Sequence, residues 1–367
     1  TSGYAGSDYF CDRVNETTKL KELLLNGNNV VLMSPRRIGK TGLLYHCFNQ
    51  PEIKENCYTF IIDIYATKNI EDLIFEMGRS IVRTLKPKGH KAIEKFLEVV
   101  SALRPGVTFD VMGNATWSLG IDKPLSPEFA LEQIFEYINQ SDKHCLIAID
   151  EFQQITYYPE KNVEAILRTY IQQCTNANFV FSGSERHLLS EMFNSPARPF
   201  FSSTSTLPLS ILPLEKYAEF VDRHFTKAEK NIPYDIIALL YERFEGVTWY
   251  MQKVFNQLYM TMQEGEVCTP NMLDQTINEI INSYSSNYAD LLYQLTSRQK
   301  QLLIAINREG KARELTSSRF IKKHHLSTAS TIQVALKSLM EKQLITHNLG
   351  EYEVYDKFMS LWINKNY

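Results

Sequence analysis

The sequence lacks any apolar run of the ~20 residues that a membrane-spanning helix requires. It also lacks a C-x-x-C pair, and its six cysteines are widely separated, several of them inside apolar runs. This arrangement is typical of reduced core thiols rather than of a disulfide framework or a zinc site. The first residues show no basic head followed by an apolar stretch, so we expect no signal peptide. These absences favour a cytoplasmic protein without a membrane segment.

Extremes of composition are missing as well. Apolar residues make up 44% of the 367 residues and charged residues 22%, which is ordinary for a globular protein with room for two or three domains. The net charge is −3, but the segment 296–367 alone contains 12 Lys/Arg against 6 Asp/Glu. The change from an acidic body to a basic tail predicts a domain boundary nearby and slightly favours duplex DNA as a partner.

The most informative stretch begins with the apolar run 30–33. It continues as the loop Ser34, Pro35, Arg36, Arg37, Ile38, Gly39, Lys40, Thr41, Gly42, and an apolar, helix-compatible segment follows. This order matches the phosphate-binding loop G-x-x-x-x-G-K-[ST], except that Ser34 replaces the first glycine. Backbone N–H groups of such a loop and of the following helix bind phosphates. We predict that residues 34–42 bind ATP, with Lys40 at the β- and γ-phosphates and Thr41 as a ligand of Mg²⁺.

A second chemical stretch follows the apolar run 145–149. Such a run indicates a parallel strand buried on both faces, and Asp150 and Glu151 come directly after it. Ligands bind at this end of the strands in open α/β sheets. We predict that Asp150 holds Mg²⁺ and that Glu151 orients and deprotonates the attacking water. A solvated strand end is the alternative interpretation.

Three smaller features belong to the same domain. Ser184 or Ser182, at the end of the apolar run 178–182, could contact the γ-phosphate. Alternating apolar residues around Gly113-Asn114 predict a β-hairpin near 104–122, inserted after a helix expected at about 90–103. The stretch YFCDR, which ends at residue 13, could wall the base of the nucleotide, although Phe10 is equally well explained as a core residue.

Beyond residue 212 the apolar spacing becomes helical. We expect a helical lid over 213–293, with its last helix running from 270 to 293. Residues 294–367 then follow as helix, helix, helix and hairpin, which is the order of a winged-helix domain. Winged helices bind DNA in some proteins and protein partners in others, so both interpretations stay open.

The combination resembles the archaeal-type ATPases, P-loop proteins of the AAA+/STAND group, over nearly the whole chain. The resemblance rests on FCDR at 10–13 with Glu16 after it, SPRRIGKT at 34–41, IDEFQ at 149–153, FSGS at 181–184 and YDKFMSLW at 355–362. It implies an α/β P-loop NTPase core over 1–212 with the AAA+ strand order 5-1-4-3-2, a helical lid, a winged helix, and ATP and Mg²⁺ as ligands. Similar proteins often carry Gly-Arg near residue 200, where this chain has Ser202-Ser203, so an arginine finger would have to come from Arg198 or Arg186.

The sequence therefore predicts an ATPase that turns over slowly and uses ATP or ADP to reposition its lid and winged helix. The alternatives are a DNA-binding regulator gated by ATP and a protein-interaction switch, both with negligible turnover. Glu151 favours hydrolysis over simple binding. A homo-oligomer stays open as well.

Overall fold

The structure is a computed structural model, and it describes residues 4–85, 107–109, 115–117, 126–348 and 350–367. The chain divides into two compact units, Thr1–Tyr217 and Ala218–Tyr367. The boundary falls inside helix α9 (Leu214–Lys227). The finer division into domains 1–212, 213–293 and 294–367 stays a prediction.

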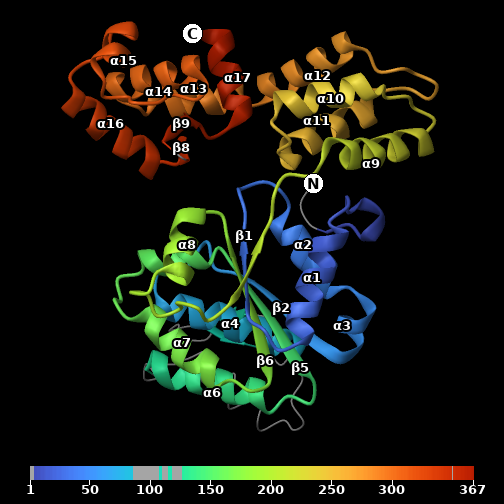
Figure 1. Cartoon of the computed structure of the whole chain (residues 1–367), viewed down its shortest axis with the longest axis vertical. Coiled ribbons are helices and arrows are strands. Elements are labelled where there is room, and N and C mark those ends of the chain that lie inside the picture. Colours follow the sequence, from blue (N-terminus) through green and yellow to red (C-terminus); the bar gives the residue numbers. More distant parts are fainter. Residues whose placement is uncertain (1–3, 86–106, 110–114, 118–125, 349) are drawn as a thin grey trace. The chain divides into compact units, whose positions relative to one another are not determined.

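A five-stranded parallel sheet forms the centre of the first unit, with the order β2-β5-β6-β1-β7 (Figure 1). Its strands are β1 (Val30–Met33), β2 (Cys57–Asp63), β5 (His144–Asp150), β6 (Ala177–Gly183) and β7 (Ser205–Pro208). Numbered within this sheet alone, the order is 5-1-4-3-2, so the expected AAA+ topology is confirmed. Every side chain of β1 and β6 is buried, as expected for strands covered on both faces.

Helices cover both faces of this sheet. On one side lie α1 (Val14–Leu25), α2 (Lys40–Phe48) and α3 (Pro51–Asn56), and on the other lie α4 (Ile70–Thr84), α6 (Pro127–Asn139), α7 (Val163–Gln173) and α8 (Arg186–Asn194) (Figure 1). Alternate residues of β5, namely Cys145, Ile147 and Ile149, belong to the core beneath the second group of helices. Because neighbouring residues of a strand point to opposite faces, Leu146 and Ala148 face the first group.

The structure describes two short strands within the segment 104–122, where the sequence predicts an inserted hairpin. Strand β3 (Val107–Phe109) pairs antiparallel with β4 (Ala115–Trp117) as a separate two-stranded sheet. The turn of the hairpin and the helix expected at about 90–103 lie outside the described residues.

The second unit contains the lid and the winged helix. After α9, the lid consists of α10 (Tyr234–Arg243), α11 (Thr248–Thr261), α12 (Pro270–Ser283) and α13 (Ser285–Tyr293). The winged helix consists of α14 (Ser297–Glu309), α15 (Ser318–Lys323), α16 (Ala329–Glu341), β8 (Ile345–Asn348), β9 (Glu351–Val354) and α17 (Lys357–Asn366). The single helix expected at 270–293 is wrong, because the chain breaks at Tyr284 into α12 and α13. Among the described residues, no helix has both the length and the apolar character that a membrane span needs.

Helix α17 links the winged helix to the lid. Its Phe358 is fully buried, with its ring 5.3 Å from that of Phe244 and 5.2 Å from that of Tyr250. The Tyr250 hydroxyl donates to the Tyr355 carbonyl (3.2 Å) and accepts from the Lys357 N–H (3.1 Å). Lid and winged helix therefore share one aromatic core, which explains why they form a single compact unit.

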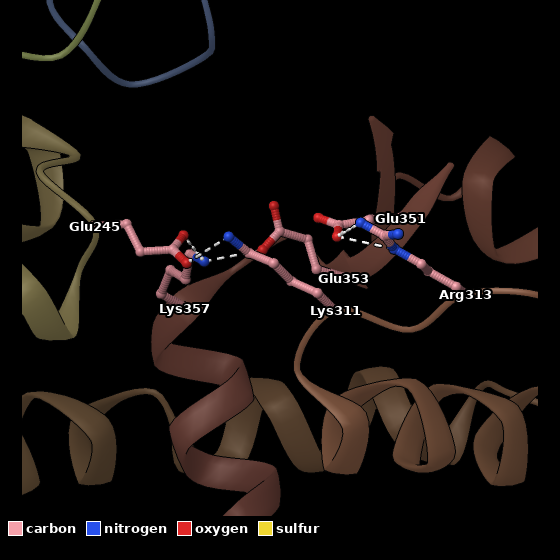
Figure 2. A network of polar contacts seen from close by, with 6 residues as sticks. All are labelled: Glu245, Lys311, Arg313, Glu351, Glu353 and Lys357. Atoms are coloured by element: carbon pink, nitrogen blue, oxygen red, sulfur yellow. Dashed lines mark hydrogen bonds and ion pairs between the residues drawn. The ribbon is translucent and has the colours of Figure 1, made fainter. Parts of the chain in front are cut away.

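A network of ion pairs lies near the start of α17 (Figure 2). Glu245, in the turn between α10 and α11, binds Nζ of Lys357 at 2.6 Å and Nζ of Lys311 at 3.1 Å. Glu353 on β9 is a second partner of Lys357, at 3.0 Å. Partly exposed pairs typically contribute less than about 1 kcal/mol each, so they orient the lid on the winged helix more than they stabilise it.

Candidate active site

The loop between β1 and α2 combines two left-handed residues with a helix N-terminus. Arg37 has φ 65° and Gly39 has φ 95°, whereas Ser34 does not have a positive φ. Serine can therefore replace the first glycine of the motif, because that position needs no left-handed backbone. Gly39 precedes α2 without a side-chain cap, and the first N–H groups of this nine-residue helix carry the partial positive charge that attracts phosphate.

An arginine from outside the loop supports it. The Arg13 side chain is buried, and its two terminal nitrogens donate to the Ile38 carbonyl (3.3 Å) and to Glu16 (2.8 Å). Arg13 itself has a left-handed backbone, with φ 61°. Arg13 and Glu16 both belong to the motif FCDR with Glu16 after it, but sequence reasoning assigned no role to Arg13. Arg13 therefore connects the segment before α1 to the phosphate loop.

Lys40 and Thr41 are the first two residues of α2. Lys40 is only 7% exposed. Burial lowers the pKa of Lys40, although the carboxylates of Asp150 and Glu151 act in the opposite direction. Phosphate oxygens would offset the cost of burying this ammonium group.

Asp150 at the end of β5 receives hydrogen bonds on both carboxylate oxygens. Thr41 Oγ1 donates to Oδ2 at 2.7 Å, while Ser182 Oγ (2.6 Å) and the Glu151 N–H (3.0 Å) donate to Oδ1. A hydroxyl and a carboxylate oxygen that meet in this way fit Mg²⁺, which commonly takes few protein ligands together with phosphates and water. The described residues hold no cluster of three His, Cys, Asp or Glu suited to a metal.

Glu151 has a left-handed backbone, with φ 57°. Non-glycine residues in this region are uncommon and often mark functional sites. Its Oε2 accepts hydrogen bonds from Ser184 Oγ (2.7 Å), the Ser184 N–H (3.2 Å) and Gln153 Nε2 (2.6 Å). Glu151 and Ser184, which the sequence suggested separately, are thus in direct contact, whereas Ser182 contacts Asp150.

A third carboxylate lies at the same edge of the sheet. Asp63 ends β2 and is the register partner of Asp150. Burial raises the pKa of Asp63, and the charges of Asp150 and Glu151 raise it further. Sequence reasoning assigned no role to Asp63, although the apolar run before it indicated a strand that ends at this residue.

The arginines near the site differ in their surroundings. Arg198, one of the two finger candidates, is ion-paired with Glu164 and also with Glu191 at 3.4 Å. Arg186, the other candidate, is exposed at the first residue of α8. Arg36 of the phosphate loop lies 3.7 Å from Glu185. The identity of an arginine finger stays a prediction.

Aromatic residues lie beside the start of α2. The ring of Phe10 stacks on His46 at 4.1 Å. Gly42 lies so close to Phe10 that a Cβ at Gly42 would be 3.5 Å from the ring. Phe10 therefore packs against the helix that follows the phosphate loop, and its expected role as a wall for the base stays a prediction.

Two protein families match the sequence. Residues 10–254 match a family described as an ATPase domain predominantly from Archaea. Residues 286–365 match one described as a probable winged helix domain. No curated protein sequence matches the chain.

Solved structures share the fold of the whole chain. The Walker-type ATPase PABY2304 of Pyrococcus abyssi is 16% identical, with 98% of each chain covered and a TM-score of 0.65. The ORC2 protein of Aeropyrum pernix, solved as ADPNP-ADP complexes, is 12% identical, with 98% of this chain and 97% of that one covered and a TM-score of 0.59. Cdc6p from Pyrobaculum aerophilum is 13% identical, with coverages of 100% and 97% and a TM-score of 0.52. Since the match to the ATPase family spans well over half of the residues, this chain belongs to the ATPase domain family found predominantly in Archaea.

Proposed function

We propose that this protein binds Mg²⁺·ATP, hydrolyses it slowly, and uses the bound nucleotide as a conformational switch. One observation carries the proposal. Glu151 stands next to Asp150, and Asp150 accepts a hydrogen bond from Thr41 of the phosphate loop. A candidate base, a candidate metal-binding pair and a phosphate-binding loop thus meet at one edge of the sheet.

The phosphates would bind to residues 34–42. The N–H groups of the loop and of the first turn of α2 would hold the phosphate oxygens, and Lys40 would contact the β- and γ-phosphates. Mg²⁺ held by Thr41 and Asp150 would neutralise charge on the phosphate oxygens when bound. The buried Lys40 and the contact between Thr41 and Asp150 both support this assignment.

Hydrolysis needs a base for the attacking water. The water oxygen forms a bond to the γ-phosphorus, and the bond from phosphorus to the β–γ bridging oxygen breaks, so that ADP and phosphate leave. Glu151 accepts the proton of the water, and Lys40 stabilises the negative charge on the phosphates. Ser184 holds Glu151, and we propose that it also contacts the γ-phosphate.

The direct test is phosphate release from ATP. We expect Mg²⁺-dependent turnover below about 10⁻² s⁻¹, the range of P-loop NTPases that act without an arginine supplied by a partner. The assay is run with Mg²⁺, with EDTA, and with duplex DNA added. If no condition gives phosphate release although ATP binds, the protein is a switch without turnover.

DNA binding is a second candidate function for the winged helix. The ORC1 protein of Aeropyrum pernix, which shares the fold with a TM-score of 0.53 at 12% identity, was solved in complex with DNA. Helices α15 and α16 of the basic tail carry four cations, Arg319, Lys322, Lys323 and Lys337. Of these, Lys323 is paired with Glu309 (2.6 Å) and Lys337 lies 4.0 Å from Glu341, whereas Arg319 and Lys322 are exposed on α15. A protein partner is the competing interpretation.

We therefore expect weak duplex binding that depends mainly on Arg319 and Lys322. Each phosphate neutralised contributes about −0.9 to the slope of log K against log salt, so these two residues predict a slope of about −2. Fluorescence anisotropy across a salt series measures it, with the double variant R319A/K322A expected to lose most of the slope. The matched control is Lys365→Ala, since Lys365 lies against Asn278 and Asn282 of the lid. A DNA affinity that does not change with salt concentration, or no binding at low salt, would instead favour a protein partner.

A further inference from the structure

A buried glutamine lies directly beside Glu151. Gln153 is in the short 3-10 helix η2 (Phe152–Tyr157) that follows β5, and it is 1% exposed. Its Nε2 donates to Glu151 Oε2 at 2.6 Å. The amide must be oriented this way, because the opposite orientation would place a carbonyl oxygen against a carboxylate oxygen.

The shape of the neighbouring strand fits this side chain. Gly183, the last residue of β6, does not have a positive φ, so its backbone does not require glycine. A Cβ at Gly183 would instead lie 2.0 Å from Gln153 Oε1 and 3.1 Å from its Cδ. The absence of a side chain at Gly183 is therefore what leaves room for the amide of Gln153.

Three donors converge on one oxygen of Glu151. Gln153 Nε2, Ser184 Oγ and the Ser184 N–H all bind Oε2. Among the described residues, none donates a hydrogen bond to Oε1, so this second oxygen is the one available to a water. With two side chains and a backbone group holding Oε2, the carboxylate can turn little about its own axis.

We propose that Gln153 is a positioning residue, which fixes the Glu151 carboxylate so that Oε1 faces the attacking water, and that Gly183 exists to admit it. This inference rests on the proposed role of Glu151 as the base. A group that fixes the base matters for the transition state and little for ATP binding. Removing it should therefore lower kcat and leave the Kd for ATP unchanged.

The experiment compares Gln153→Met with Gln154→Met. Methionine keeps the length of the side chain and removes the amide. Gln154 is on the same 3-10 helix but donates to the Thr67 carbonyl (3.0 Å), so Gln154→Met removes a hydrogen bond that does not involve Glu151. We expect Gln153→Met to lower kcat at least about tenfold, the scale of one lost hydrogen bond to a charged group, with Kd by calorimetry within about twofold of the parent. Gln154→Met should leave both values within about twofold.

A double variant separates positioning from a general structural effect. If Gln153 acts through Glu151, then Gln153→Met should cause no further loss of kcat in the Glu151→Gln background. An equal loss in both backgrounds, or a parental kcat in Gln153→Met while Glu151→Gln is inactive, overturns the inference and leaves the proposed function intact. A parent that never releases phosphate overturns both.

Gly183 offers an approach from the other side. Gly183→Ala should displace the amide and lower kcat in the same way as Gln153→Met. Its loss of Tm should be smaller in a Gln153→Ala background, where the amide is gone and only Leu189 Cδ1, 3.1 Å from the added methyl group, still has to shift. An equal loss of Tm in the two backgrounds would contradict the fit of Gln153 against Gly183.

Discussion

Replacing Glu151 with glutamine should leave ATP binding near the parental affinity and slow hydrolysis by a factor of roughly 10²–10⁴, the usual contribution of a general base. Glutamine keeps the size of the side chain and can still accept a hydrogen bond from Ser184 through its carbonyl oxygen. It cannot accept the proton of the water, which is required only as the transition state forms. The Glu151→Gln protein should therefore accumulate with ATP bound.

Single-turnover phosphate release and calorimetry measure the two effects separately. Glu136→Gln is the matched control, because this carboxylate on α6 accepts hydrogen bonds from Gln133 and Gln140 instead. A Glu151→Gln protein that turns over at the parental rate would show that Glu151 is not the base. A matching loss in ATP affinity would point to a role in binding instead.

Replacing Lys40 with methionine should weaken ATP binding without weakening the nucleotide-free fold. The lost contact is a hydrogen bond to a charged group, typically about 1.5–3 kcal/mol, which corresponds to roughly 10- to 150-fold in Kd. The stability of the nucleotide-free protein should change in the opposite direction, because the substitution removes a buried charge. Burial lowers the pKa of Lys40 in the folded state, so its charged form is disfavoured there relative to the unfolded chain.

The pH dependence follows from that direction. The penalty is fully present at pH values below the folded pKa of Lys40 and disappears as the pH rises through it toward the ordinary value of 10.5. At neutral pH, the nucleotide-free Lys40→Met protein should thus have a Tm no lower than the parent, and this advantage should shrink in alkaline solution. Thermal unfolding across a pH series tests this, and calorimetry gives the Kd. Lys143→Ala, which removes a lysine bonded to the Glu55 carbonyl, is the control for a lost surface lysine. Parental ATP affinity in Lys40→Met would show that the site is elsewhere.

The sequence predicts those helices and strands in which burial against the core sets a regular spacing of apolar residues. The apolar run 145–149 predicts a doubly covered strand, and β5 is such a strand. The break at Tyr284 could not be predicted, because no glycine or proline marks it. The ring of Tyr284 lies 6.4 Å from Phe358 of α17, so this part of the lid packs against residues that are distant in sequence. Helix α17 was not predicted, because the expected winged-helix order of three helices and a hairpin does not include it.

The sequence predicted the motifs of the site but not the contacts that hold them in place. The loop 34–42 and the pair Asp150-Glu151 follow from local patterns, since each is a strand end with its loop. The partners of those residues come from elsewhere in the chain. Arg13 contacts the Ile38 carbonyl, and Gln153 fits against Gly183 of another strand. Side-chain contacts between distant segments leave no periodic signal, and only the assembled fold reveals them.

The burial of Phe358 among the rings of the lid limits where this chain can be divided into folded fragments. Cleaving the chain at residue 294 would separate α17 from Phe244 and Tyr250. The Phe358 side chain would then be exposed to water on one fragment, and the other fragment would lose the ring that packs against Phe244 and Tyr250. The winged helix is therefore not a detachable module, and the compact unit that contains it begins at Ala218. The same packing joins the lid firmly to the winged helix. Because Phe358 and Tyr250 join the two parts, we expect the lid and the winged helix to move together as one body.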